Sequence, residues 1–320
     1  MKVVVIPGLT LREVSDEDVA RIREAGGDAE VVVTNPQGAE TEIADADVVF
    51  GFVSRRMYLG AQNLRWVHAI SSGVDAFLYD EFRDGDVVLT SEKGLVGDHL
   101  ADTGFGLLLM LTRQLAAALR YGPDSWNHRP EMRYQEVELT GSTMGIFGFG
   151  GTGRAMARRA AAFGMDVIAM DREPVVPSPE VPEVQGEGYF DELLARSDVV
   201  AICTPLTPET RGKFDAAAFA RMKETAFLVN VTRGEVMVED DLVAALESGQ
   251  IRGAGLDVVP REPLPADSPL WSLPNVVMTP HTAGASQFRA GRNMERFLRN
   301  LERLRRGEEL EGVIDKQLGY

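Results

Sequence analysis

The sequence predicts an α/β protein with two doubly wound parallel sheets. The chain has 320 residues, more than one hydrophobic core usually serves, so two domains are expected. Short runs rich in Val and Ile alternate with amphipathic helical patterns, once before residue 98 and again after it. Strands that alternate with helices pair in parallel, because each helix carries the chain back across the sheet.

The composition is that of an acidic globular protein. Hydrophobic residues make up 44% of the chain, charged residues 26%, and the formal net charge is −16. Such a chain offers no overall positive field, so neither nucleic acid nor a membrane surface is expected as a partner. Cys203 is the only cysteine. A disulfide within the chain and a multi-cysteine metal site are therefore excluded, and no bound metal is expected.

No segment has the pattern of a targeting signal or a membrane span. The apolar run at the amino terminus stops at Pro7-Gly8, which is too early for a signal peptide. The most apolar stretch, residues 105–111, is much shorter than the roughly 20 residues that a membrane helix needs. With a single cysteine, the chain is expected to be cytoplasmic.

The first alternation covers the amino-terminal third. Strands are predicted at 3–7, 30–35, 47–53, 64–71 and 86–91, with a helix over 16–26. A long helix is then predicted over 97–120. Its apolar residues wrap further round than one stripe, which predicts burial on more than one side. A helix between two lobes and a subunit interface explain this pattern equally well.

The second alternation begins at residue 143. Strands are predicted at 143–147, 166–171, 198–204, 226–231, 253–258 and 275–280, helices at 151–163, 191–197, 215–222 and 239–249, and a loop at 174–185. This is a complete doubly wound sheet. A helix over 285–306 and the tail 309–320 are too short for a further domain, so they are expected to return to the first lobe.

A glycine-rich turn follows the strand 143–147. Its residues are Gly148, Phe149, Gly150, Gly151, Thr152 and Gly153, which match GxGxxG. The first glycine permits a tight turn, the second lets the backbone approach a pyrophosphate, and the third allows close packing of helix on strand. The helix amino end adds amide donors and partial positive charge. Glycines that only turn a corner are the alternative.

An acidic residue closes the next strand. Asp171 stands 18 residues after Gly153, near the spacing expected for a residue that binds the adenosine ribose. A carboxylate there accepts hydrogen bonds from the ribose hydroxyls and repels a 2′-phosphate, so NAD is the expected cofactor. Arg172 follows at once and could either stack on the adenine or accommodate a 2′-phosphate, so NADP stays possible.

Three polar segments stand where later strands give way to loops, at 230–234, 255–263 and 279–284. In open α/β sheets this edge binds ligands. Arg233 has the fork geometry to grip a carboxylate and to polarise a carbonyl. His281 can exchange a proton near neutral pH, and a carboxylate such as Glu262 favours its protonated form. Together they predict reduction of a 2-oxo acid.

The order of these motifs resembles the D-isomer-specific 2-hydroxyacid dehydrogenase family. The resemblance rests on GxGxxG, Asp171, CTPLTPETRG at 203–212, VNVTRG at 229–234, GLDVVPREP at 255–263 and TPHTAG at 279–284, with SSGVD at 71–75. It implies a Rossmann NAD-binding domain, residues 99–284, inserted into a flavodoxin-like substrate domain, residues 1–98 and 285–320. It also implies a homodimer formed through the region 99–121.

The same resemblance implies roles for individual residues. The catalytic set would be Arg233 as carboxylate anchor, His281 as acid and base, and Glu262 as its orienting partner. Besides the glycine-rich turn, Asp171 and Arg172, the cofactor would be bound by Thr204, Pro205, Thr210, Val231, Asp257, His281 and Ala283. The substrate would be bound by Ser72, Gly73, Val74, Arg233 and His281.

Several readings stay open at this point. Corepressors of the same family use the fold to sense NADH, so a binding protein is the alternative to an enzyme. A phosphorylated substrate would need a second cationic site, for which Arg55 and Arg56 are candidates. Enzymes of this fold that act on formate pair glutamine with the histidine, so Glu262 favours a hydroxy acid.

Five further residues are interpreted individually. Thr152 and Cys203 depart from the commonest family pattern and bear on cofactor affinity. His68 and His99 are expected to pack or cap. Trp126 resembles a family tryptophan that can reach the neighbouring subunit's active site, and surface packing explains it equally well.

Overall fold

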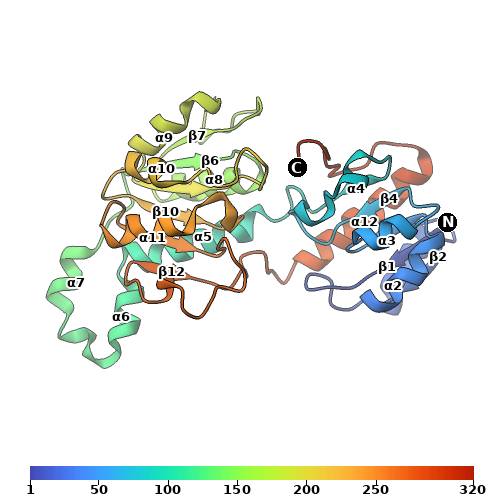
Figure 1. Ribbon diagram of the computed structural model, residues 1–320, viewed down its shortest axis with the longest axis horizontal. Helices are drawn as coiled ribbons and strands as arrows, with labels where there is room; N and C mark the ends of the chain where they lie inside the picture. Colours follow the sequence, from blue (N-terminus) through green and yellow to red (C-terminus); the bar gives the residue numbers. More distant parts are fainter. The chain divides into compact units, whose positions relative to one another are not determined.

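The computed structural model describes residues 1–320 and contains two compact units, each with its own parallel sheet (Figure 1). The first unit comprises residues 1–96 and 285–320, and the second comprises residues 97–284. None of the helices combines the length and the apolar character that crossing a membrane requires.

The first unit is built on a five-stranded sheet with the order β2-β1-β3-β4-β5, which is the flavodoxin-like order of a doubly wound fold. Its strands are β1 Lys2–Val5, β2 Glu30–Val33, β3 Val48–Phe50, β4 Trp66–His68 and β5 Val88–Thr90. Its α-helices are α1 Asp16–Ala25, α2 Pro36–Glu42, α3 Arg55–Gly60, α4 Asp80–Asp84 and α12 Arg289–Arg306.

Both faces of this sheet are buried, because successive side chains of a strand point to opposite sides. Along β1, Val3 packs in one core with Phe297 of α12, and Val4 packs in the other with Phe82 of α4. The carboxyl-terminal tail adds an antiparallel bridge from Val313 to β5. The last part of the chain therefore completes the core in which the chain begins.

The second unit is built on a seven-stranded parallel sheet with the order β12-β11-β10-β9-β6-β7-β8, a Rossmann order with one added strand. Its strands are β6 Thr143–Phe147, β7 Asp166–Met170, β8 Val184–Gln185, β9 Val199–Ile202, β10 Phe227–Asn230, β11 Gly253–Leu256 and β12 Val276–Met278. Its α-helices are α5 Gly97–Thr112, α6 Leu115–Tyr121, α7 Arg129–Gln135, α8 Gly151–Ala162, α9 Phe190–Arg196, α10 Ala216–Arg221 and α11 Glu239–Glu247.

The predicted pair of doubly wound sheets is confirmed. In the second unit, α5 and α8 contribute to the core on one face, and α9, α10 and α11 contribute to the core on the other. β6 lies between β7 and β9, so the chain reverses its winding direction there. Ligands of open α/β sheets bind at such a switch point, beyond the carboxyl ends of the strands.

The prediction of one helix over 97–120 is wrong. The helix α5 ends at Thr112, and α6 starts at Leu115. Gln114 between them has φ of +54°, a left-handed conformation that a continuous right-handed helix cannot contain. The expected burial holds for α5, whereas Leu119 of α6 is 74% exposed. With α7, α6 forms an arm that projects from the rest of its unit (Figure 1).

Five short elements have no counterpart in the sequence prediction. The helices α2, α3, α4 and α7 have at most seven residues each, too few for a clear helical period. The strand β8 lies in the segment 174–185 that was expected to be a loop. It has two residues, and it pairs with β7.

Candidate active site

The glycine-rich turn lies between β6 and α8, at the switch point of the second unit's sheet. Gly148 has φ of +96°, and a Cβ there would lie 2.8 Å from the backbone nitrogen of Thr204. A Cβ on Gly153 would lie 2.2 Å from the carbonyl oxygen of Gly148. Contacts this short are repulsive in a close-packed interior, so both positions require glycine.

The first turn of α8 presents its amides to open space. Gly150 is the N-cap residue, and no side chain caps the helix. A Cβ on Gly150 would meet no atom within 4 Å. The first amides of a helix lack intrahelical partners and carry partial positive charge. This arrangement suits an anionic group such as a pyrophosphate.

Asp171 follows β7, and its carboxylate is tied to the glycine-rich turn. Phe149 donates its backbone N–H to Oδ2 of Asp171 at 2.6 Å, and Glu173 donates its backbone N–H to Oδ1 at 3.1 Å. An ionised carboxylate has about four acceptor positions. Asp171 therefore keeps the capacity to accept further hydrogen bonds from a diol.

The turn after β10 is organised by a fully buried asparagine. Nδ2 of Asn230 donates to the carbonyl oxygen of Arg233 at 2.9 Å, and Oδ1 accepts from the backbone N–H of Thr232 at 3.1 Å. The Arg233 guanidinium itself donates to the carbonyl of Thr232 at 2.8 Å. The backbone that carries the guanidinium is thus held from both sides.

The turn after β12 is organised by Asp257, the buried residue that follows β11. Its carboxylate accepts from the hydroxyl of Thr279 at 2.6 Å and from the backbone N–H groups of Thr282 and Ala283, each at 2.9 Å. Its carbonyl oxygen accepts from the backbone N–H of His281 at 2.8 Å. Asp257 therefore fixes the residues on both sides of the histidine.

His281 and Glu262 form a hydrogen-bonded pair, with 2.7 Å between Nδ1 and Oε2. The other oxygen of Glu262 accepts from the backbone N–H of Val259 at 3.2 Å. Because an ionised carboxylate can only accept, Nδ1 of His281 carries the proton of this bond. The second ring nitrogen, Nε2, is then the atom that can exchange a proton with a ligand.

The model of the family described as "D-isomer specific 2-hydroxyacid dehydrogenase, NAD binding domain" matches residues 105–283. The chain belongs to the D-isomer-specific 2-hydroxyacid dehydrogenase family. It is an NAD(P)-dependent oxidoreductase, as the motif order predicted.

Relatives of this dehydrogenase are similar over most of their length. It is 32% identical over 337 residues to a hydroxypyruvate reductase of Blautia hydrogenotrophica, covering 99% of this chain and 100% of that one. It is 34% identical over 273 residues to a glyoxylate reductase of Korarchaeum cryptofilum, covering 83% and 80%. The solved NADPH-dependent glyoxylate/hydroxypyruvate reductase of Sinorhizobium meliloti is 29% identical, with a TM-score of 0.81 and 100% coverage of both chains.

The residues present in the second unit of the dehydrogenase fit a dinucleotide. The turn at Gly148 and Gly153 has no room for side chains, the amino end of α8 offers amide donors, and the carboxylate of Asp171 keeps free acceptor positions. The close backbone approach and the amide donors suit the pyrophosphate, and the free acceptor positions of the carboxylate suit the ribose diol.

The other residues predicted to bind the cofactor differ in their burial and in their hydrogen bonds. Thr204 is buried beside Gly148, and Val231 and Ala283 are also buried. Thr210, in contrast, uses its hydroxyl within its own loop, where it donates to the carbonyl of Pro205 at 2.8 Å and accepts from the backbone N–H of Thr207 at 2.8 Å. Thr210 therefore shapes this loop.

The residues predicted to bind the substrate carboxylate, apart from Arg233 and His281, belong to the first unit. Ser72, Gly73 and Val74 lie in the turn that follows β4. Ser71 donates its hydroxyl to the carbonyl of Gly73 at 2.8 Å, which fixes the shape of this turn. Val74 is buried.

The two arginines considered for a second anionic group have carboxylate partners. Arg55 donates to both carboxylate oxygens of Glu81, and this ion pair lowers the pKa of Glu81 to about 2. Arg56 pairs with Glu40 at 3.1 Å. Each guanidinium therefore already has an anionic partner, which a phosphate would have to displace.

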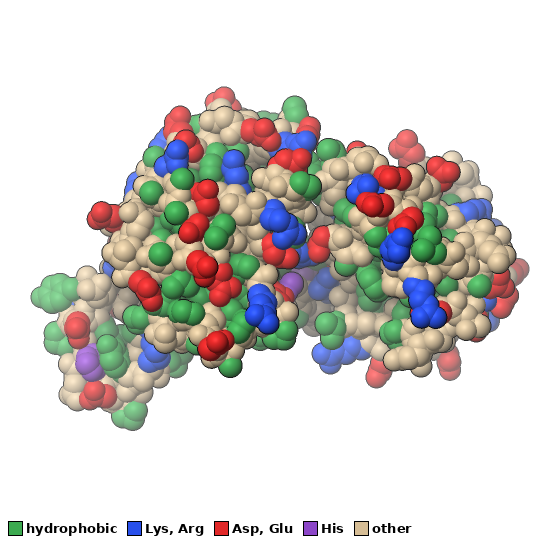
Figure 2. All heavy atoms as spheres, viewed as in Figure 1, with side chains coloured by type: hydrophobic (Ala, Val, Ile, Leu, Met, Phe, Trp, Pro, Cys, Tyr) green, Lys and Arg blue, Asp and Glu red, His purple; other side chains and the backbone are tan.

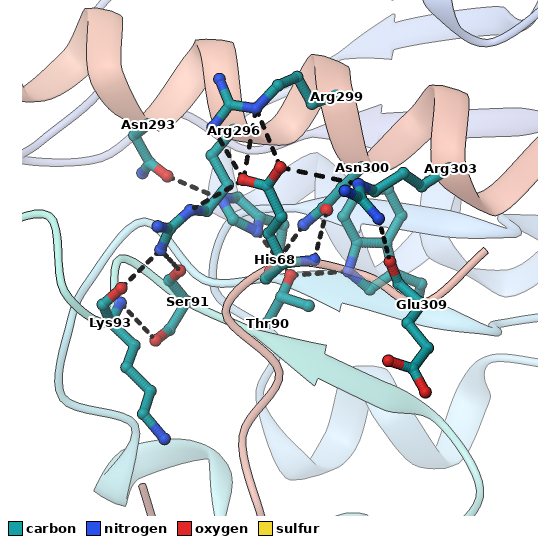
Figure 3. A network of polar contacts seen from close by, with 12 residues as sticks. His68, Thr90, Ser91, Lys93, Asn293, Arg296, Arg299, Asn300, Arg303 and Glu309 are labelled. Carbon is teal, nitrogen blue, oxygen red and sulfur yellow. Dashed lines mark hydrogen bonds and ion pairs between the residues drawn. The ribbon is translucent and has the colours of Figure 1, made fainter. Parts of the chain in front are cut away.

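His68 has a structural environment, as its position in a strand suggested. It is fully buried in β4, and its ring is hydrogen-bonded to Thr90 and Asn293 (Figure 3). Burial lowers the pKa of His68 to about 4. The ring is therefore neutral over the physiological pH range.

Sequence reasoning gave no role to Asn230, or to Glu187 and Glu209, whose carboxylates lie 3.9 Å and 3.4 Å from the guanidinium of Arg172. The signal for Asn230 was its place as the last residue of an apolar strand before a short polar turn, where an asparagine commonly bonds to nearby backbone. The glutamates give no such signal, because they come from separate segments of the sequence.

Proposed function

We propose that this dehydrogenase interconverts a small 2-oxo acid and its D-2-hydroxy acid with NAD, and that Arg233, Glu262 and His281 are its catalytic set. The observation that carries the proposal is the 2.7 Å bond between His281 and Glu262. It commits Nδ1 to the carboxylate and leaves Nε2 for the substrate oxygen. When bound, the nicotinamide cofactor supplies the hydride for reduction and accepts it in oxidation.

His281 would supply the proton. In reduction, a protonated imidazole gives the Nε2 proton to the carbonyl oxygen while the adjacent carbon gains the hydride, so the product is a neutral hydroxyl. In oxidation the same nitrogen removes the proton from that hydroxyl. Glu262 stabilises the imidazolium by charge and keeps the ring oriented.

Arg233 would bind the substrate carboxylate and polarise the carbonyl. Its guanidinium presents donors in a fork that matches a carboxylate. The backbone N–H groups of Ser72, Gly73 and Val74 are proposed as further donors to the carboxylate. The hydrogen bonds of Asn230 support the role of Arg233, because they fix the backbone from which the guanidinium extends.

The proposed substrates are small and not phosphorylated. Relatives are named glyoxylate reductase and hydroxypyruvate reductase, and such substrates carry a single anionic group. The ion pairs of Arg55 with Glu81 and of Arg56 with Glu40 support this choice. A phosphate could bind either guanidinium only by displacing its carboxylate partner. Asp171 supports NAD over NADP.

The test is a turnover panel with purified enzyme. Glyoxylate, hydroxypyruvate, pyruvate, phenylpyruvate and phosphohydroxypyruvate are each offered with NADH and with NADPH, and turnover of glyoxylate or hydroxypyruvate with NADH is expected. His281→Ala should lower kcat by about 10²- to 10⁴-fold while the NADH dissociation constant changes far less. Preference for phosphohydroxypyruvate, or wild-type turnover in His281→Ala, would contradict the proposal.

A further inference from the structure

A single arginine stands at the expected ribose end of the dinucleotide site, and three glutamates surround it. The guanidinium of Arg172 lies 3.6 Å from a carboxylate oxygen of Glu173, 3.9 Å from one of Glu187 and 3.4 Å from one of Glu209. It also follows directly on Asp171. Three carboxylates therefore surround one cation.

The convergence of these glutamates is a property of the fold. Glu187 begins the short 3₁₀ helix Glu187–Tyr189 after β8. Glu209 comes from the loop after β9, where hydrogen bonds with the Thr207 side chain and with its own backbone, together with the charge of Arg172, lower the pKa of Glu209. Both carboxylates therefore reach Arg172 from segments that are distant from it in sequence.

The position of Asp171 relates this cluster to the cofactor. Its carboxylate is bonded to the backbone of Phe149 in the glycine-rich turn, and in this fold the acidic residue at that position binds the adenosine ribose. A 2′-phosphate on the ribose would bring up to about two negative charges. Its natural partner would be the guanidinium of Arg172.

We propose that Glu187 and Glu209 are specificity-determining residues that keep Arg172 from binding a 2′-phosphate. The carboxylates hold the guanidinium and add negative charge around it, so NADP meets repulsion where it would need attraction. NAD has only a hydroxyl at this position, so the surrounding carboxylates do not weaken its binding. The selection against NADP thus comes from three segments, of which the acidic residue after β7 is one.

This inference deepens the proposed preference for NAD, and its test measures binding rather than turnover. Isothermal titration calorimetry gives the dissociation constants of NAD and of NADP for the wild type, Glu209→Gln and the double variant Glu187→Gln/Glu209→Gln. The wild type is expected to bind NAD more tightly. The double variant is expected to bind NADP about tenfold more tightly than the wild type, equal to about 1.4 kcal/mol, with the NAD constant within about twofold.

Two controls separate this effect from a general change in charge. Glu192 also pairs with an arginine, Arg196, and its side chain is 57% exposed, against 56% for Glu209. Glu192→Gln should leave both dissociation constants unchanged. Adding Arg172→Ala to the double variant should abolish its gain for NADP, because the freed guanidinium is the group that binds the phosphate.

The outcomes that overturn the proposal are distinct from a failure of the proposed reaction. A wild type that binds NADP as tightly as NAD would overturn it. An equal gain in Glu192→Gln, or a gain that survives Arg172→Ala, would do the same. A chain that binds NAD selectively but reduces no 2-oxo acid would refute the proposed reaction and leave this assignment of Glu187 and Glu209 standing.

Discussion

Gly234 and Val259 touch backbone to backbone: a Cβ added to Gly234 would lie 1.9 Å from the carbonyl carbon of Val259. This contact joins two of the three proposed catalytic residues. Gly234 follows Arg233 in the turn after β10, and Val259 donates its backbone N–H to Glu262. The position of the turn that carries Arg233 therefore depends on the position of the turn that carries Glu262.

Gly234→Ala is expected to inactivate the enzyme although one methyl group is added. The turn must move by more than 1 Å to relieve the clash, and a misplacement of this size in a catalytic group costs about 100-fold in rate. Overpacking should also cost about 1–3 kcal/mol of stability. Steady-state kinetics and thermal unfolding measure the two effects.

The matched control for Gly234→Ala is Gly186→Ala. Gly186 lies in the same unit with φ of −84°, which any residue adopts, and a Cβ there would meet no atom within 4 Å. Its activity and melting temperature should stay at the wild-type values. Full activity in Gly234→Ala would show that the two turns are not coupled through this contact.

Asn230→Asp is expected to raise the KM for the 2-oxo acid by about tenfold or more. An ionised aspartate cannot donate, so the carbonyl of Arg233 loses its partner inside the protein and the turn loosens. The dissociation constant of NADH should change much less, because Asn230 makes no bond to the glycine-rich turn. Substrate kinetics and NADH titration separate the two sites.

Asn275→Asp is a suitable comparison for Asn230→Asp. Asn275 donates in the same way to backbone carbonyls, those of Leu246 and Arg252. It precedes β12, however, and so stands at the amino ends of the parallel strands, whereas the turns after β6, β10 and β12 follow the carboxyl ends. It should lower stability without raising KM. Similar KM values in the two variants would remove Asn230 from any role in positioning Arg233.

The arm of α6 and α7 gives a prediction about assembly, for which we propose a homodimer through the α5 and α6 region. Leu119, Trp126 and Tyr134 on this arm are 74%, 77% and 87% exposed, and green apolar side chains mark it in Figure 2. Exposed apolar groups gathered on one projection are typical of an interaction surface. Light scattering should give twice the chain mass of 35.0 kDa.

Leu119→Asp should convert this dimer to monomer by placing a charge in the interface. Val176 offers a matched control, because it is 78% exposed in the same unit but lies in a loop outside the arm. Val176→Asp should leave the mass unchanged. A wild type with the mass of one chain, or a Leu119→Asp variant that stays dimeric, would exclude this surface.

The sequence predicted the sheets well, because strands buried on both faces form runs of Val and Ile that are easily recognised. It failed where a single backbone angle decides, as at Gln114, whose left-handed φ ends α5. It also found the catalytic candidates by residue type, since arginine, glutamate and histidine carry their chemistry visibly. What it could not give were contacts between distant segments, such as Gly234 against Val259 or Glu209 beside Arg172.

His68 gives a prediction about stability and pH in the first unit. Nε2 of His68 lies 2.7 Å from Oδ1 of Asn293, which can only accept, so Nε2 carries the proton of the neutral ring. Nδ1 is then an acceptor, and the hydroxyl of Thr90 donates to it at 2.6 Å while accepting the Nε1–H of Trp66 at 2.8 Å. Every position of the ring is used by the neutral form, and desolvation lowers the pKa of His68 to about 4.

The sign of the effect follows from proton binding. In the unfolded chain a histidine has a pKa of about 6.5, so between about pH 6.5 and 4 the unfolded state binds a proton that the folded state excludes. The contribution of His68 is therefore complete above pH 6.5 and is lost as the pH falls towards 4. A difference of this size amounts to about 3 kcal/mol.

His68→Gln removes this titration and isolates it from the carboxylates, which titrate alike in both proteins. We expect the wild type to be the more stable protein at pH 7.5 and its advantage to shrink as the pH falls to 4.5. A Trp126→Phe/Trp271→Phe background leaves Trp66, which is fully buried beside His68, as the fluorescent reporter of urea unfolding in this unit. If the stability gap between the two proteins stays constant from pH 7.5 to 4.5, His68 is not a proton-excluding residue.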